Sequence, residues 1–333
     1  MATIWEQKQI LRNIVDGLNA AVAEQGLDPE EIDPIKLNKL LYLAVDHFDL
    51  PVTYWWYKYG SDFTFHGIGP ESVKPKALKE LPTPTQPRLG PDDLDEDEGY
   101  PSPEQYKDFY VNHVQDLERL FEDDTKEYLR SFYRNYAPAE LEDLYTACAV
   151  FQKTLDSIGY ADNASEKTSE EIDTILQELR ELDREVHIHP HLEDIQDEYS
   201  TYTELLKDVL VTVDEIEGRL GESEEVYRDL IRFFYDGAWQ IVAFKIASQN
   251  SHGSDAFERK EVANGRLQTL LDDWENDITG LRNRCERYEL IADEFKSYEQ
   301  PIAREASQST KRELIDRARK EWDGVSREAS RDL

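Results

Sequence analysis

The stretch VYRDLIRFFYDGAWQIVAFKIA, residues 226–247, does most to decide the fold of this 333-residue chain. When it is drawn as a helix, apolar side chains fall on most of its faces. Such a helix is typical of the centre of a bundle, where neighbouring helices cover it on all sides. The stretch therefore predicts a buried central helix inside a longer helical segment over 222–249.

Two apolar stripes predict the helices that pack around this centre. The later stripe repeats by threes and fours, close to the 3.5-residue period of a coiled-coil seam. It comprises Leu267, Leu271, Trp274, Ile278, Leu281, Cys285, Tyr288, Ile291 or Ala292, and Phe295. A helix expected over 193–219 offers a partner stripe of Tyr202, Leu205, Val209, Val213, Ile216 and Leu220. Residues 161–300 are thus expected to form a helical bundle with long coiled-coil-like helices.

The earlier half of the chain is also mainly helical by its patterns. Residues 4–24 carry one apolar stripe that ends at Gly26. Asp33 followed by Pro34 predicts the start of a second helix, with Asp as N-cap and Pro at the first helical position. The aromatic and β-branched run over 52–60 predicts a short strand. Further helices are expected over 103–135, 138–159, 168–186, 255–298 and 309–328.

These patterns predict a mainly α fold with four parts. Residues 1–81 and 103–160 form an N-terminal helical domain with one short extended segment, and the bundle over 161–300 follows. Residues 82–102, acidic and rich in proline, are expected to be a loop or linker because they can bury little apolar surface. Residues 301–333 form a charged amphipathic helix, expected to dock on the body of the protein or on another protein.

The charge of the chain is its strongest compositional signal. Asp and Glu total 72 against 38 Lys and Arg, which gives a formal net charge of −34. Such self-repulsion destabilises a compact state in dilute buffer, but at about 1 M salt the screening length falls to about 3 Å. The composition is typical of a salt-adapted, halophilic protein. Nucleic-acid binding is disfavoured, because phosphate contacts need clustered cations.

The expected location is the cytoplasm. The N-terminus is amphipathic and has no signal-peptide core. The most apolar window, 233–247, is too short for a membrane span and contains Asp236 and Lys245. Cys148 and Cys285 stand far apart, so neither a disulfide framework nor a zinc ribbon is expected.

Three histidines are the candidate metal ligands. His187, His189 and His191 precede Glu193 and Asp194, and imidazole and carboxylate groups are suitable zinc ligands. However, alternate residues do not share a helical face, and Pro190 predicts a turn here, so solvent-exposed histidines are the expected outcome. No nucleotide-binding, nucleophile-elbow or zinc-protease motif occurs. The chain is expected to be neither an enzyme nor a cofactor-binding protein.

Two segments together resemble a known family. Lys36-Leu37-Asn38-Lys39-Leu40-Leu41-Tyr42-Leu43-Ala44, followed by Tyr54-Trp55-Trp56-Tyr57-Lys58-Tyr59-Gly60, is similar to the Panacea or SocA-like antitoxin domain. The similar segments at 126–136 and 139–145 extend the resemblance over about residues 10–155. Ser61-Asp62 stands where that family has proline, and the insert at 82–103 is a further departure.

The resemblance implies a non-enzymatic module that binds and restrains a partner protein, either an antitoxin-like protein whose partner is a toxin or an adaptor. The candidate partner-binding residues are Tyr54, Trp55, Trp56, Tyr57, Lys58, Tyr59 and Gly60, expected as an exposed aromatic cluster. Because alternate side chains of a strand face opposite ways, one set can enter the core and the other a partner. The alternative is that both sets are buried.

Two alternatives stay open. The chain could be a scaffolding protein that forms a homo-oligomer through its C-terminal bundle, and self-association would then survive deletion of residues 1–160. It could also be a metal-dependent hydrolase that uses the histidines and nearby carboxylates, and substitution of His189 by Ala would then abolish its activity.

Overall fold

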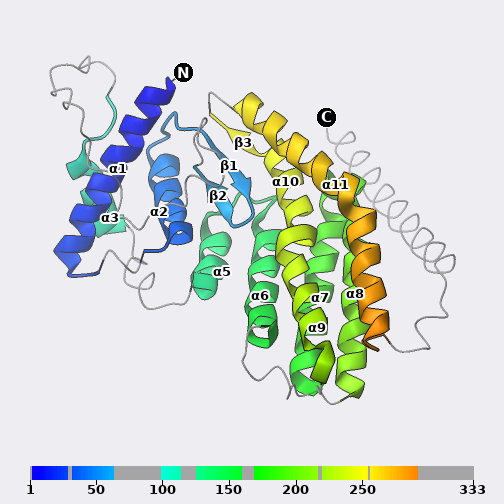
Figure 1. Cartoon of the computed structure of the whole chain (residues 1–333). Helices are drawn as coiled ribbons and strands as arrows, with labels where there is room; N and C mark the ends of the chain where they lie inside the picture. The colour runs from blue at the N-terminus through cyan, green and yellow to red at the C-terminus, as the bar shows by residue number, and fades with distance from the viewer. Residues whose placement is uncertain are drawn as a thin grey trace, which may run out of the picture.

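The computed structural model describes residues 2–28, 32–63, 99–113, 125–159, 169–216, 220–253 and 256–291. These residues are mainly helical, which confirms the predicted fold class (Figure 1). The predicted boundary at 160–161, most of the 82–102 loop and the whole of the 301–333 helix lie outside the described residues.

The two N-terminal helices begin where the sequence predicts. Helix α1 (Ile4–Gln25) starts with a capping box between Thr3 and Glu6 and ends at Gly26, whose φ of 70° closes the helix. Helix α2 (Pro34–His47) starts at Asp33, whose side chain accepts a hydrogen bond from the Lys36 amide at 2.8 Å. The predicted cap and first-position proline of α2 are both confirmed.

The helices that follow match the predicted segments in order. They are α3 (Pro103–His113), α5 (Thr125–Tyr136), α6 (Glu142–Gly159), α7 (Ser169–Ile188), α8 (Gln196–Glu215), α9 (Glu224–Phe233), α10 (Trp239–Gln249) and α11 (Ala256–Arg287). A 3-10 helix, Pro190–Ile195, precedes α8, and another, Gly221–Ser223, precedes α9. The expected helix over 103–135 corresponds to α3 and α5, and residues 114–124 between them lie outside the described part of the chain.

The central apolar segment is helical throughout but is not one α-helix. Between α9 and α10 lies a π-helix, Phe234–Ala238, which inserts a wider turn into the expected continuous helix. Within it, a Cβ on Gly237 would lie 2.7 Å from the Phe233 ring, so only glycine fits there without a shift. Single π-turns inside α-helices occur frequently at functional sites.

The predicted stripe of the last long helix is confirmed along α11. Leu267, Trp274, Ile278, Leu281 and Cys285 are buried, and the helix packs on α8, α9 and α10. The helix is shorter than predicted, because Glu289 has a φ of 56° that an α-helix cannot contain. The expected continuation of the stripe to Tyr288 is therefore wrong.

A small antiparallel sheet lies between the two halves. Strand β1 (Tyr54–Tyr57) pairs with β2 (Gly60–Asp62) on one side and with β3 (Ser251–His252) on the other. The predicted strand is confirmed in β1. Neither partner strand was predicted, and β3 comes from nearly 200 residues further along the chain, between α10 and α11.

Helix α2 covers the outer edge of this sheet. The buried ammonium of Lys39 donates a hydrogen bond to the Ser61 carbonyl at 2.8 Å, and Asn38 Oδ1 accepts one from the Phe63 amide at 3.2 Å. These two side chains satisfy backbone groups of an edge strand that would otherwise have no ladder partner.

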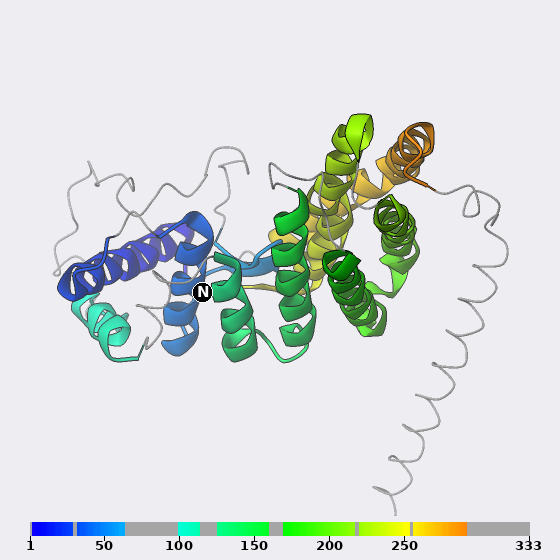
Figure 2. The same ribbon diagram turned by 90° about the horizontal axis from the view of Figure 1, so that it is seen from below.

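One apolar core joins both halves. Buried side chains from Ile10 to Ile291 form one large cluster that includes Trp56 of β1, while Trp55 on the other face of the strand forms a small second cluster with Ala247 and Ala263. Figures 1 and 2 show α1, α2 and α3 on one side of the sheet and the bundle of α7 to α11 on the other, with α5 and α6 in between. The sheet therefore lies where the two halves of the chain meet.

Candidate functional site

The predicted partner-binding segment is mostly inside the protein. Trp56 has no exposed surface, Trp55 is buried, and Tyr54 and Tyr57 are half-buried. The expectation of an exposed aromatic cluster is therefore wrong. The reason is that β1 is the middle strand of the sheet and both of its faces are covered.

The two faces of β1 pack against different helices. Trp56 makes edge-on contacts with Tyr42 of α2 and Tyr145 of α6, with ring centroids 5.5 and 5.4 Å apart. On the opposite face, Tyr57 packs on Phe244 of α10 at 4.6 Å. Aromatic pairs of this geometry stabilise a core beyond their buried area. The strand thus joins the two halves through its side chains.

The turn between β1 and β2 brings Lys58 and Tyr59 toward the surface. Its backbone is held by two buried side chains, since the Tyr145 hydroxyl donates to the Tyr57 carbonyl at 2.8 Å and Trp239 Nε1 donates to the Lys58 carbonyl at 2.7 Å. These bonds fix the position of the two residues that precede β2.

Gly60 is the residue that lets the turn fit. It has a φ of 80°, and a Cβ there would lie 2.8 Å from Tyr133 Cε1 and 3.2 Å from Lys39 Nζ. Both the left-handed backbone and the lack of space therefore require glycine. Its place in the predicted partner-binding segment is explained by the geometry of the turn.

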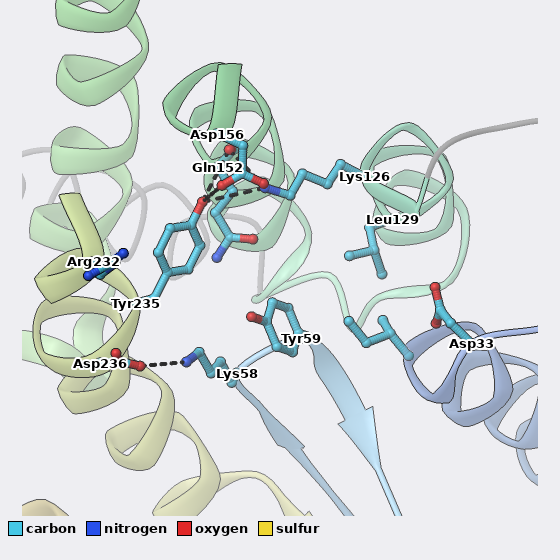
Figure 3. Close-up of a pocket in the computed structure, with 11 residues that line it drawn as sticks. Asp33, Lys58, Tyr59, Lys126, Leu129, Gln152, Asp156, Arg232, Tyr235 and Asp236 are labelled. Carbon is cyan, nitrogen blue, oxygen red and sulfur yellow. Dashed lines mark hydrogen bonds and ion pairs between the residues drawn. The ribbon is translucent and has the colours of Figure 1, made fainter. Parts of the chain in front are cut away.

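The turn forms one wall of an open pocket with a volume of about 450 Å³. The other walls come from α2 with its N-cap, α5, α6, and the junction of α9 with the π-helix (Figure 3). The pocket is lined by Asp33, Ile35, Lys58, Tyr59, Lys126, Leu129, Gln152, Asp156, Arg232, Tyr235 and Asp236. Three cationic and three acidic side chains meet there, so the formal charge of the lining is zero.

At one end of the pocket, Lys126 is fully engaged. Its ammonium is paired with the Asp156 carboxylate and donates a hydrogen bond to the backbone carbonyl of Gln152 at 2.9 Å. It also lies 3.4 Å from the Tyr235 hydroxyl. The Tyr235 hydroxyl in turn donates a hydrogen bond to the Asp156 carboxylate and lies 3.2 Å from the same backbone carbonyl of Gln152. Figure 3 shows Lys126 and Tyr235 approaching Asp156 from opposite sides. This network ties α5, α6 and the π-helix together.

At the other end, Lys58 is held less tightly. Its Nζ lies 3.6 Å from Asp236 Oδ1, and the Asp236 side chain is 75% exposed. Burial lowers the pKa of Lys58, against the effect of Asp236, which raises it. The Lys58 ammonium is thus a partly desolvated charge at the pocket wall with one distant carboxylate.

Gln152 supplies an unused hydrogen-bond donor between these ends. Its side chain is 2% exposed, and Nε2 has no hydrogen-bond partner among the described residues. In Figure 3 the amide lies between Tyr235 and Lys126, with its nitrogen directed toward the side of the pocket where Tyr59 lies. Buried amides normally have partners, so this donor is exceptional.

The three candidate metal ligands do not come together. The expectation that they are solvent-exposed is wrong for His189, which is 5% exposed. His187 is engaged by the Asp183 carbonyl at 2.7 Å and by the Ser200 hydroxyl at 3.1 Å, while buried His189 accepts from the His191 amide at 3.3 Å. His189 and His191 have ring centroids 5.6 Å apart and both lie at the start of the 3-10 helix, His189 as its N-cap. Within the described ranges, no group of three His, Cys, Asp or Glu side chains could hold a metal ion.

The pocket contains two of the seven predicted partner-binding residues, Lys58 and Tyr59. The other lining residues were not predicted, because they come from five segments that only the fold brings together. One local signal was present, since Asp236 is followed directly by Gly237 inside a largely apolar stretch. Such a polar residue followed by glycine inside a buried helix indicates a close approach or a local irregularity.

A family model described as "Domain of unknown function (DUF8098)" matches residues 1–316. The chain belongs to this family. No curated protein and no solved structure is significantly similar to the chain. Among the described helices of this DUF8098 member, none combines the length and apolar composition needed to cross a membrane.

Proposed function

We propose that this protein is a non-enzymatic, antitoxin-like or adaptor protein that binds a partner protein and restrains it, and that the partner engages the pocket at the β1–β2 turn. The observation that carries the proposal is the position of Lys58 and Tyr59. These two members of the predicted partner-binding segment reach an open pocket, while the tryptophans before them form the core.

The state of the ionisable groups supports binding over catalysis. Asp156 is bonded to Lys126 and Tyr235, and Asp236 is paired with Lys58. A general base must accept a proton from a substrate, and Asp156 already accepts from an ammonium and a hydroxyl. The nearby Cys148 thiol is buried and its pKa is raised well above its ordinary value, so it is a poor nucleophile.

The test is affinity purification of the tagged full-length chain from its native host at high salt, with mass spectrometry of the proteins that co-elute. We expect one stoichiometric partner, lost when Lys58→Met and Tyr59→Ala are combined. Substitution of Trp55 or Trp56 would be a poor test, because both side chains are buried and their loss would damage the fold.

Lys207→Met is the matched control. Lys207 Nζ lies 3.5 Å from Asp183, close to the spacing of the Lys58 pair, but it lies outside the pocket lining. The partner should be retained by this variant. Recovery of the chain alone, or only with itself, would reject the proposal and favour a self-associating scaffold.

A further inference from the structure

We propose that the pocket is a carboxylate-binding site, which takes a monovalent carboxylate carried on a small apolar or aromatic group. This inference rests on the proposed function, because it names the chemical group that the partner presents at the β1–β2 turn. A free small carboxylic acid offers the same chemistry, and the experiment below separates the two sources.

Gln152 provides the donor that the protein itself does not use. The amide is 2% exposed, and its Nε2 has no acceptor among the described residues. A buried donor without a partner is unfavourable, and that free energy is recovered when a ligand oxygen accepts the bond. Gln152 lines the pocket, and its Nε2 has less than 1 Å² of exposed surface, so a ligand oxygen reaches this donor when the side chains over it shift.

Lys58 provides the charge. Among the described residues, the carboxylate paired with its ammonium is the distant and mostly exposed Asp236, at 3.6 Å, and the ammonium also lies 5.8 Å from the centre of the Tyr59 ring. The ammonium has three N–H donors to offer. Lys126, by contrast, already has a carboxylate, a carbonyl and a hydroxyl around it. A ligand carboxylate between Lys58 and Gln152 would accept charge-assisted hydrogen bonds, which are about twice as strong as neutral ones.

The rest of the lining restricts the kind of anion. The carboxylates of Asp33, Asp156 and Asp236 balance the three cations, so the pocket has no surplus positive charge for a dianionic phosphate. Ile35 and Leu129 offer apolar surface, and Tyr59 and Tyr235 add ring faces. A volume of about 450 Å³ is within the range of pockets that hold small ligands, so a ring-sized group fits beside the carboxylate.

The test uses the full-length protein labelled with ¹⁵N in its glutamine side chains, observed by NMR. Phenylacetate is titrated as the probe and phenylacetamide as its neutral counterpart. We expect phenylacetate to shift the Gln152 amide signals in a saturable way and phenylacetamide to leave them unchanged. Gln152→Leu assigns these signals by removing them.

Variants then locate the charge. Lys58→Met should weaken phenylacetate binding by about tenfold or more, as expected for loss of a charge-assisted hydrogen bond. Lys207→Met, whose ion pair lies elsewhere, should bind as the unmodified protein does. Equal shifts with phenylacetate and phenylacetamide, or no shift with either, would overturn the proposal, and this comparison needs no variant to fold.

Two dipeptides separate the sources of the carboxylate. Acetyl-Ala-Phe with a free carboxyl end is compared with its amidated form. Binding of the free form about tenfold tighter than phenylacetate would support a chain end of a partner, and equal affinities would support a free carboxylic acid. If Lys58→Met abolishes partner capture although no carboxylate binds, the proposed function stands and only the ligand class is rejected.

Discussion

The β1–β2 hairpin and the pocket beside it differ sharply although they share adjacent residues. In the hairpin, Trp56 and Gly60 lie in a packed environment where ring contacts and backbone geometry leave no space. In the pocket, Lys58 has one distant partner and Gln152 has an amide donor with none among the described residues. The difference indicates that the hairpin is built for stability, whereas the pocket retains groups that cost stability. Substitutions on the two sides should therefore behave in opposite ways.

Trp56→Ala tests the hairpin side and should have the largest effect. Truncation of a fully buried tryptophan leaves a large cavity and typically costs about 3–5 kcal/mol. Lys58→Met, in the pocket, should change the free energy of unfolding by less than about 1 kcal/mol, because its ion pair is loose and one partner is mostly exposed. Denaturant unfolding of both variants at constant salt measures the difference. Similar losses of unfolding free energy for the two variants would mean that the hairpin and the pocket contribute alike to stability.

Gly60→Ala sharpens the same comparison within the turn. The left-handed backbone costs about 1–2 kcal/mol for a residue with a Cβ, and the contact at 2.8 Å with Tyr133 adds overpacking of about 1–3 kcal/mol. Gly26→Ala is the matched control, since its φ of 70° is similar and nothing lies within 4 Å of its Cβ position. Thermal or denaturant unfolding should show the larger loss for Gly60. Equal losses of stability would mean that the side chains around Gly60 move to accommodate the added Cβ without a loss of free energy.

The sequence predicts the parts of this fold that are set by short-range patterns. The caps at Asp33 and Gly26, the stripe of α11 and the extended run at β1 are all local signals, and each is confirmed. The pairing of β1 with β3 depends on the fold of the whole chain between them. Because β3 has only two residues, it is too short to show the alternation of apolar and polar residues that predicts a strand. Exposure of the aromatic segment was predicted wrongly, because nothing local shows that helices cover both faces of a strand.

The site is less predictable for the same reason. Lys58 and Tyr59 could be found because they follow a recognisable aromatic run, but the side chains they meet come from α5, α6 and the π-helix. Gln152 lies in an ordinary helical stretch, and its lack of a partner is a property of its surroundings. At the far wall of the pocket, the Asp236–Gly237 pair is a local signal of an irregular turn, but it does not identify a site.

The buried Lys39 behind the hairpin predicts a dependence of stability on pH. Its side chain is 1% exposed, and burial lowers its pKa to about 7, whereas an unfolded lysine titrates near pH 10.4. Between these values the unfolded chain binds a proton at Lys39 that the folded chain lacks, so the contribution of Lys39 to stability rises with pH. From about pH 7 to about pH 9.5 the Lys39 contribution should rise by on the order of 2–3 kcal/mol. The buried thiols of Cys148 and Cys285 and the buried tyrosines, whose pKa values are raised, change stability in the opposite direction in this window.

Lys39→Met should remove the Lys39 contribution. The thiols and tyrosines are present in both proteins, so the difference in the free energy of unfolding between the unmodified protein and the variant should increase with pH by about this amount. Denaturant unfolding across this pH window measures the slope, and Lys207→Met, whose ion pair with Asp183 is partly buried, serves as the control. An unchanged slope in Lys39→Met would show that its ammonium stays charged in the folded protein.

The smallest expected effect compares two buried glutamines. Gln196, 4% exposed, donates to the carbonyls of His187 at 2.9 Å and Val186 at 3.4 Å, whereas the Gln152 amide nitrogen has no partner among the described residues. Replacing Gln196 by Leu should cost about 1–3 kcal/mol, because two carbonyls lose their donor. Replacing Gln152 by Leu should cost nothing or stabilise the protein, because an unsatisfied donor is removed. Denaturant unfolding of the two variants gives the change in the free energy of unfolding for each. No loss for Gln152→Leu would support a donor that is unsatisfied until a ligand binds. A loss at Gln152 as large as that at Gln196 would mean that the donor is satisfied in solution without a ligand.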